Sequence, residues 1–124
     1  MADRSSADNV GGIAAWHAHV YYDPPGTRHV AEQVRSGIAE RFPIARLGRW
    51  HDVPVGPHTR AMFQVAFGAE LFPALVPWLM LNRGGLSVLL HPETGHPQAD
   101  HLAHAAWLGE QLPLDASVLP TRAE

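Results

Sequence analysis

Hydrophobic and polar residues alternate along residues 12–22, which read GIAAWHAHVYY. One set of alternate positions is apolar or aromatic, and the other carries two imidazoles and a phenol: Trp16, Ala18, Val20 and Tyr22 against His17, His19 and Tyr21. Because successive side chains of a strand point to opposite faces, this pattern predicts a strand with one core-facing side. Two histidines on the other side are either ordinary solvent-facing residues or the start of a metal site, and the rest of the chain must decide.

Further along the chain, the hydrophobic period changes from two to about 3.6 and back. Val30, Val34 and Ile38 recur at helical spacing after Thr27, a residue suited to an N-cap. The second helix contains Pro77, where we expect a late start or a kink. We predict helices over residues 27–42, 70–82 and 100–108, the last capped by Asp100, and further strands over residues 44–50, 60–67 and 86–91.

The unit strand, helix, strand occurs twice in the predicted element order, and one more helix follows it. This order predicts an α+β, ferredoxin-like fold: a βαββαβ antiparallel sheet with an extra C-terminal helix. In that fold the strands lie in the order 4-1-3-2 and both helices of the repeats cover one face. We also expect a disordered tail over residues 1–11 and a single domain over residues 12–124. From Gln111 onward we expect an extended segment that packs on another surface, either of this chain or of a partner subunit.

The predicted topology places the first strand between the third and the fourth. His17 and His19 then share the uncovered face of the sheet with His91, which ends the fourth strand, and with His58, which precedes the third. Gln64 of the third strand falls on the same side. Since neighbouring strands lie about 4.8 Å apart, imidazoles on adjacent strands can reach one ion. The sequence therefore predicts a metal site built from three or four histidines.

A site of two histidines and a carboxylate fits the pattern less well, because the nearest acids all lie in predicted loops: Asp23, Asp52 and Glu93. His101 follows the predicted cap Asp100 and can close over the uncovered face. The other histidines are expected at the surface, with His51 compatible with either position: His29, His51, His96 and His104. Neutral imidazole suits iron, zinc, copper and nickel alike, so the pattern alone leaves the metal open.

Composition removes several classes of protein. The chain has no cysteine, which excludes disulfides, iron–sulfur clusters and thiolate sites. Nine arginines and no lysine stand against twelve acids, and this net charge of −3 argues against a nucleic-acid partner. The first residues lack the pattern of a signal peptide, and the longest apolar run, residues 71–81, contains two prolines and is too short to span a bilayer. We expect a soluble, cytoplasmic protein without a membrane partner.

Four motifs that occur in order resemble the DOPA 4,5-dioxygenase family. They are WHAHVYY at residues 16–22, GPH at 56–58, LNRGGLSVLLHP at 81–92, and Asp100-His101 followed by WLG at 107–109. The resemblance covers residues 16–119 and implies a ferredoxin-like homodimer with non-haem Fe(II). One position departs from the family pattern, which has an acid after Thr94-Gly95 where this chain has His96. We interpret that loop position as one that affects substrate access.

The resemblance also implies an activity: cleavage of the ring of L-DOPA or a related catechol next to the diol, with O2. His17, His19, His58 and His91 match the metal-binding motifs of the family. We expect His19, His58 and His91 to bind the metal, and His17 either to bind it too or to act as the acid–base residue. His101 is the second candidate for a catalytic residue.

Two further residues are candidates for substrate binding. Tyr21 and Arg83 are expected to orient the catechol, and a guanidinium can hold a substrate carboxylate through two hydrogen bonds. Arg83 is equally well explained as a cation at the C-terminal end of a helix. The alternative to an enzyme is a non-catalytic, dimeric ferredoxin-like module that binds a metal or a small aromatic molecule on its uncovered sheet face.

Overall fold

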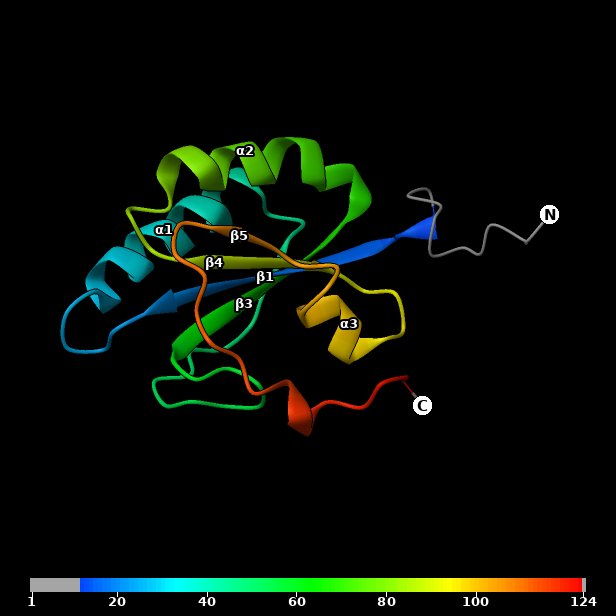
Figure 1. Cartoon of the computed structure of the whole chain (residues 1–124). Coiled ribbons are helices and arrows are strands. Elements are labelled where there is room, and N and C mark those ends of the chain that lie inside the picture. Colours follow the sequence, from blue (N-terminus) through cyan, green and yellow to red (C-terminus); the bar gives the residue numbers. More distant parts are fainter. Residues whose placement is uncertain (1–11, 124) are drawn as a thin grey trace.

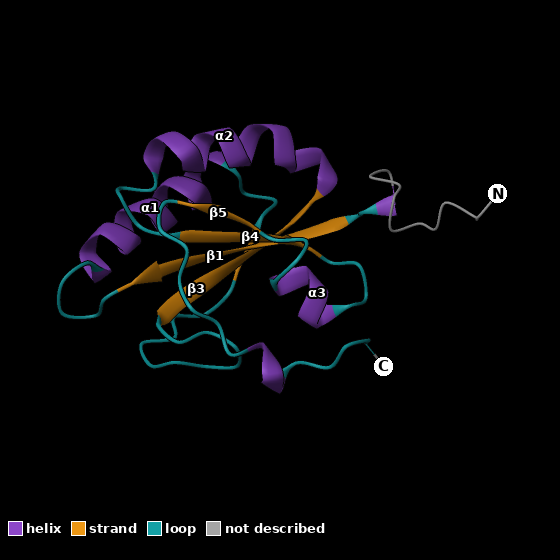
Figure 2. Ribbon diagram, viewed as in Figure 1, coloured by secondary structure: helices purple, strands orange, loops and turns teal. Residues whose placement is uncertain are grey.

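The computed structural model describes residues 12–123, which form a five-stranded antiparallel sheet in the order β2-β3-β1-β4-β5 (Figure 1). The strands are β1 (Ala15–Tyr22), β2 (Arg46–Leu47), β3 (Ala61–Gly68), β4 (Val88–Pro92) and β5 (Ala106–Leu108), and the helices are α1 (Arg28–Arg41), α2 (Phe72–Asn82) and α3 (Pro97–His101). Helices α1 and α2 cover one face of the sheet, and the short α3 lies on the other (Figure 2). The predicted α+β ferredoxin-like fold is confirmed.

Strand β1 is the central strand, because both of its edges are paired, one with β3 and the other with β4. The apolar side chains of β1 face the helices: Ala18 and Val20 are fully buried in a core with Val34 and Ile38 of α1. Leu79 of α2 is equally buried in that core. The alternation seen in the sequence thus separates a helix-covered face from the face that carries the histidines.

Strand β2 has only two residues, whereas the sequence predicts a strand over residues 44–50. The strand ends at Leu47, just before Gly48. The chain still runs beside β3 at this point, because the backbone N–H of Gly48 donates to the Gln64 carbonyl at 2.7 Å. A side chain at this position would begin only 3.3 Å from the same carbonyl oxygen. His51 then makes an isolated bridge to Met62. The predicted strand is therefore a short pair followed by single contacts.

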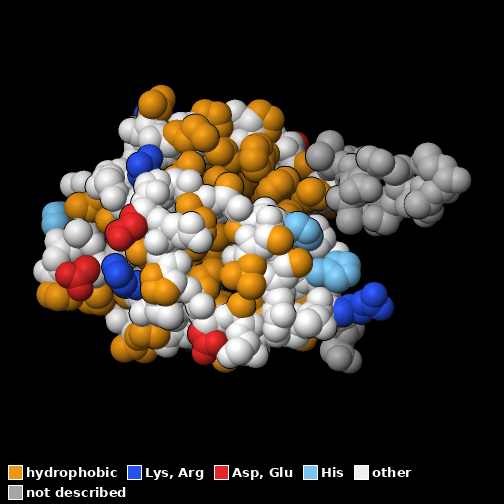
Figure 3. All heavy atoms as spheres, in the orientation of Figure 1, with side chains coloured by type: hydrophobic (Ala, Val, Ile, Leu, Met, Phe, Trp, Pro, Cys, Tyr) orange, Lys and Arg blue, Asp and Glu red, His pale blue; other side chains and the backbone are white. Residues whose placement is uncertain are grey.

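The predicted helix over residues 70–82 begins later, at Phe72, after a single 3-10 turn at Ala69–Leu71. Pro73 lies in the first turn, where its missing N–H costs nothing, and Pro77 is accommodated inside the helix. The exposed side of α2 carries apolar residues such as Met80 and Leu81, and Figure 3 shows apolar side chains gathered over this helix.

The predicted helix over residues 100–108 is wrong in its bounds. Helix α3 starts at Pro97 and ends at His101, and the chain then adds β5 to the edge of β4. Asp100 is not the N-cap of this helix. Its carboxylate instead accepts hydrogen bonds from the backbone N–H and the hydroxyl of Thr94, which closes the loop before α3.

The segment after β5 crosses the histidine-bearing face of the sheet (Figure 1). Leu112 is buried there with Tyr21, Met62 and Leu89, and Leu114 packs against this second apolar cluster. The face that the sequence describes as uncovered is therefore partly covered by α3 and by the C-terminal segment. The predicted tail over residues 1–11 lies outside the described residues, and no helix among residues 12–123 has the length and apolar character needed to cross a membrane.

Candidate metal centre

Five imidazoles gather on the sheet face opposite α1 and α2. His17 and His19 project from β1, and His17 pairs directly with His91 of β4. His58 precedes β3, and His101 is contributed by α3. We call this group the imidazole cluster. His19 lies at its centre, with ring centroids 4.2 Å from His58, 5.2 Å from His91 and 6.0 Å from both His17 and His101.

Two sets of three ligand atoms lie within 4.8 Å of one another, and His19 belongs to both. The first set joins His19 to His17 and His91, and the second joins it to His58 and His101. The Nε2 atoms of His19 and His91 are 3.1 Å apart. Two imidazole nitrogens bound to one ion at about 2.1 Å would be about 3.0–3.4 Å apart, so this pair has the separation of two ligands on one metal.

Backbone carbonyls fix the proton position on two of the rings. Nδ1 of His91 lies 3.0 Å from the Pro92 carbonyl oxygen, and Nδ1 of His101 lies 2.8 Å from the Pro97 carbonyl oxygen. Because a carbonyl oxygen only accepts, each Nδ1 must carry the hydrogen and donate it. The Nε2 atom of each ring is then left with its lone pair, which is the state a metal ligand requires.

His58 is held by a turn and by a tyrosine. Gly56 has a φ of 57°, a conformation that favours glycine, and the backbone N–H of His58 donates to the Val55 carbonyl. Nδ1 of His58 lies 2.7 Å from the hydroxyl oxygen of Tyr21, which is buried. If Nδ1 donates to that oxygen, Nε2 of His58 is also free to bind a metal. The structure thus places Tyr21 behind a histidine of the cluster.

Burial keeps these rings neutral. Loss of hydration lowers the pKa of His91 to about 3 and that of His58 to about 4, and it moves the pKa of His19 well below its ordinary value. Neighbouring imidazoles act in the same direction, and the pKa of His17 is lowered for the same reasons. Neutral imidazole is the form that binds metal ions, so these four histidines are in their binding form at pH 7.

One atom of the cluster is left without a partner. Nδ1 of His19 is buried and makes no hydrogen bond to any residue within 12–123. An unpaired polar atom in the interior costs about 1–3 kcal/mol. A metal ion would fit this cluster in two ways, either with Nε2 of His19 and Nε2 of His91 as ligands or at the partnerless Nδ1 of His19. Only the second would satisfy the unpaired atom.

A carboxylate that the sequence leaves in a loop lies beside the cluster. Glu93 has Oε2 at 3.5 Å from Nδ1 of His91 and at 3.7 Å from Nδ1 of His17. Burial and the nearby Asp100 raise its pKa. Asp52 lies elsewhere, where it accepts hydrogen bonds from Tyr22 and Arg28. Of these acids, Glu93 lies near the Nδ1 atoms of two imidazoles, those of His17 and His91, and is placed to orient both rings.

Asp100 determines where His101 lies. It is almost fully buried, and besides its bonds to Thr94 it contacts Nδ1 of His104 at 2.9 Å. These contacts fasten the short α3 to the loop after β4. The side chain of His101, one residue later, is thereby held 4.0 Å, ring to ring, from His91.

Arg83 lies away from the imidazole cluster. It directly follows α2, one of the two helices on the other face of the sheet, and its Nη1 donates to the Met80 carbonyl at 2.9 Å. This is the position of a helix C-terminal cation, the alternative that the sequence leaves open. Among the remaining histidines, His104 binds Asp100, and His29 and His96 are exposed, as expected.

Two cavities flank the imidazole cluster. The first, of about 250 Å³, borders His101 and is lined mainly by apolar groups, including Trp107, Leu112 and Leu114. The second, of about 230 Å³, borders His17 and is lined by both a cationic side chain, Arg46, and an anionic one, Glu70. Neither cavity is apparent in the sequence, because one depends on the C-terminal segment and the other on the two-residue β2, and neither of these has regular hydrophobic spacing.

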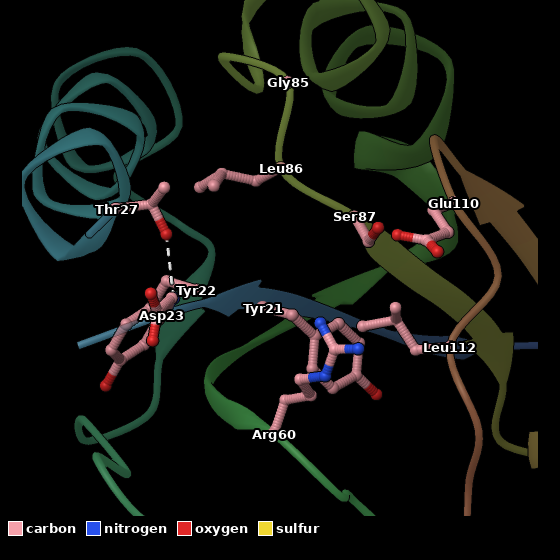
Figure 4. Close-up of a pocket in the computed structure, with 10 residues that line it drawn as sticks. All are labelled: Tyr21, Tyr22, Asp23, Thr27, Arg60, Gly85, Leu86, Ser87, Glu110 and Leu112. Carbon is pink, nitrogen blue, oxygen red and sulfur yellow. Dashed lines mark hydrogen bonds between the residues drawn. The ribbon is translucent and has the colours of Figure 1, made fainter. Parts of the chain in front are cut away.

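A third cavity, of about 220 Å³, lies at the far end of β1 (Figure 4). Its walls include three charged residues, Arg60, Asp23 and Glu110. The ring of Tyr21 separates it from the cluster, since the Tyr21 hydroxyl contacts His58. This cavity therefore does not open on the imidazoles.

Comparison with known proteins identifies a family and several relatives that this chain resembles. The sequence profile of the Dopa 4,5-dioxygenase family matches residues 16–118. A DOPA 4,5-dioxygenase of Amanita muscaria is 29% identical in an alignment of 119 residues that covers 90% of this chain and 52% of that protein. An uncharacterized 21.2 kDa protein of Botryotinia fuckeliana is 39% identical in an alignment of 115 residues that covers 85% of this chain and 63% of that protein. The chain thus spans between about half and just under two thirds of the length of these curated relatives.

A solved structure is similar over more of its length. The crystal structure of a candidate dioxygenase from Nostoc punctiforme superposes with a TM-score of 0.83 at 51% sequence identity, covering 86% of this chain and 91% of that one.

Proposed function

The chain belongs to the Dopa 4,5-dioxygenase family, and from this premise we propose that it is a non-haem iron(II) dioxygenase that opens the ring of L-DOPA or a related catechol. Both atoms of O2 enter the product as the bond next to the two hydroxyls breaks. The observation that carries the proposal is the imidazole cluster, in which His19 and His91 present Nε2 atoms 3.1 Å apart. Iron(II), when bound, supplies the redox chemistry that allows O2 to react with a catechol.

We assign the metal-binding role to His19, His58 and His91, which are all buried and, by their lowered pKa values, neutral at pH 7. The fixed Nδ1–H of His91 aims its Nε2 lone pair into the cluster. His101 is similarly fixed, and its contact with the apolar cavity places it between the cluster and an approach route. An apolar cavity suits O2 and an aromatic ring, since neither carries a charge.

His17 is the proposed acid–base residue. Its side chain is 22% exposed, whereas that of His91 is fully buried, so His17 can meet a substrate at the edge of the cluster. Its lowered pKa leaves it neutral at pH 7, and a neutral imidazole can accept the proton of a catechol hydroxyl. Glu93, 3.7 Å from Nδ1, would then stabilise the imidazolium that forms.

The activity test is oxygen uptake. Purified protein is stripped of metal, loaded with iron(II) under nitrogen, and mixed with L-DOPA and other catechols in air-saturated buffer. We expect one O2 consumed per catechol and a yellow ring-opened product, with His29→Ala as active as the wild type and His19→Ala inactive. Metal binding without oxygen uptake for any catechol would contradict the proposal and favour a non-catalytic binding module.

A homodimer and a cytoplasmic location complete the proposal, and both rest on the family resemblance and the composition. Sedimentation of the metal-loaded protein tests the first. A monomer that retains full oxygen uptake would separate the oligomeric state from the activity.

A further inference from the structure

The cavity beside His17 exists because its floor is made of small residues. Ala15 pairs with Gly68, and the next pair on the same sheet face joins His17 to Ala66. Cross-strand partners share a face of the sheet, so the floor presents two methyl groups and one bare backbone next to an imidazole. Larger residues here would fill the hollow of about 230 Å³.

A cation stands on one wall of this cavity. Arg46 of β2 pairs with Ala66, which in turn pairs with His17, so the three residues form one row across the sheet. Two strand spacings separate Arg46 from His17, about 10 Å between backbones, and the arginine side chain spans much of that distance. Its positive charge contributes to the lowered pKa of His17. Within residues 12–123 no carboxylate forms an ion pair with Arg46.

An anion stands on the other wall. The carboxylate of Glu70 folds back over Gly68, where a Cβ atom would lie only 2.1 Å from Oε1. Only glycine at position 68 therefore leaves room for the carboxylate in this place. Glu70 lines the same cavity as Arg46 and His17, and the described part of the chain provides it with no ion-pair partner.

We propose that Arg46 and Glu70 form a subsite for the amino-acid end of the substrate. This inference rests on the proposed function and names the residues that select among catechols. The guanidinium of Arg46 binds the substrate carboxylate, and the carboxylate of Glu70 binds the substrate ammonium. A three-carbon side chain held between them directs the aromatic ring toward His17 and His91. The subsite replaces Arg83, whose position on the opposite face of the sheet removes it from the cluster.

Four catechols that differ in the charged groups of their side chains test the subsite: L-DOPA (zwitterion), 3,4-dihydroxyphenylpropionate (anion), dopamine (cation) and 4-methylcatechol (neutral). Their dissociation constants are measured by calorimetry on zinc-loaded protein, in which no redox turnover occurs. We expect Arg46→Gln to weaken the zwitterion and the anion by about tenfold to a hundredfold and to leave the cation and the neutral catechol unweakened. Glu70→Gln should weaken the zwitterion and the cation instead.

Arg49→Gln is the matched control, because Arg49 is an exposed arginine three residues further along the same segment and lines none of the cavities described above. It should change none of the four constants. The subsite is overturned if Arg46→Gln affects all four ligands equally or none of them, or if the wild type binds the neutral catechol as tightly as L-DOPA. If the charge pattern appears but the iron-loaded protein consumes no oxygen, the subsite stands and the proposed dioxygenase activity fails.

Discussion

The two faces of β1 are buried to a similar degree but have different roles. On the helix side, Ala18 and Val20 are fully buried among apolar groups, and every contact there favours folding. On the other side, His19 is only 2% exposed, yet one of its ring nitrogens has no partner among the described residues. Burial alone therefore does not distinguish core from site. The distinction lies in whether the buried atoms are satisfied by the protein itself.

The comparison has an energetic meaning. Apolar burial contributes about 25 cal/mol for each Å² removed from water, whereas an unpaired imidazole nitrogen costs about 1–3 kcal/mol. The helix side stabilises the fold with or without a ligand. The imidazole side should stabilise it fully only when a metal ion is bound, since an ion that binds the folded state alone raises its stability.

The largest expected effect separates neighbours on the two faces. His19→Ala should lower iron(II) affinity by more than about a hundredfold. Loss of a ligand should cost more than loss of a hydrogen-bond partner of a ligand, which lowers metal affinity by about 10–100-fold. Val20→Ala should leave the affinity of the folded protein unchanged. Titration of the metal-free variants with iron(II) under nitrogen measures both. Equal affinities in His19→Ala and in the exposed control His29→Ala would place the metal elsewhere.

The second effect concerns pH and the metal-free protein. Because the pKa values of His58 and His91 are lowered to about 4 and 3, the unfolded state, with pKa values near 6.5, binds more protons than the folded state between these limits. Stability should therefore be complete above about pH 6.5 and fall as the pH decreases, by up to about 1.4 kcal/mol per pH unit for each histidine. Urea unfolding between pH 7 and 5 checks this. A curve that is flat over that range would show that the imidazoles are not buried.

The third effect reverses the roles of the two faces. In metal-free protein Val20→Ala should lower the free energy of unfolding by about 2 kcal/mol, since two methyl groups leave a closed core. His19→Leu, of similar size, should change it by less than about 1 kcal/mol, because an unpaired polar atom is removed along with its contacts. Chemical denaturation in the presence of a chelator measures both. A larger loss for His19→Leu would mean that the imidazole side contributes to folding on its own.

How far the sequence predicts this arrangement depends on regular spacing. Alternation in β1 assigns its faces, and the pairing of β1 with β4 brings His17 and His91 together as the topology requires. The two-residue β2 and the segment that places Leu112 over the site have no hydrophobic period. Their positions depend on long-range contacts that spacing does not encode. For this reason the sequence does not predict Arg46 as a residue of the site.

The other wrong predictions concern the ends of helices. Asp100 has the character of an N-cap residue, but in the folded chain its carboxylate binds Thr94 and His104. The helix therefore starts three residues earlier and ends at His101. The placement of His101 over the sheet was expected, but the loop that holds it could not be derived from local propensity.

The smallest expected effect concerns the residue behind the cluster. Tyr21→Phe removes the hydroxyl that contacts Nδ1 of His58 at 2.7 Å and keeps the buried ring. We expect iron(II) affinity to fall by about tenfold and stability to change by about 1 kcal/mol, which are the usual values for a hydrogen bond behind a ligand. Tyr22→Phe is the matched control, since its hydroxyl bonds Asp52 on the opposite face. Equal affinity losses in both variants would remove Tyr21 from the site.

The location of the metal tests the account most directly. Crystals of the iron-loaded protein, measured on both sides of the iron absorption edge, give the position of the ion by anomalous scattering. We predict one peak on the histidine-bearing face, at about 2.1 Å from a ring nitrogen of His19 and of at least two other members of the imidazole cluster. A peak away from His19, or iron bound only at exposed residues such as His29 and His96, would contradict the assignment of this face as the metal centre.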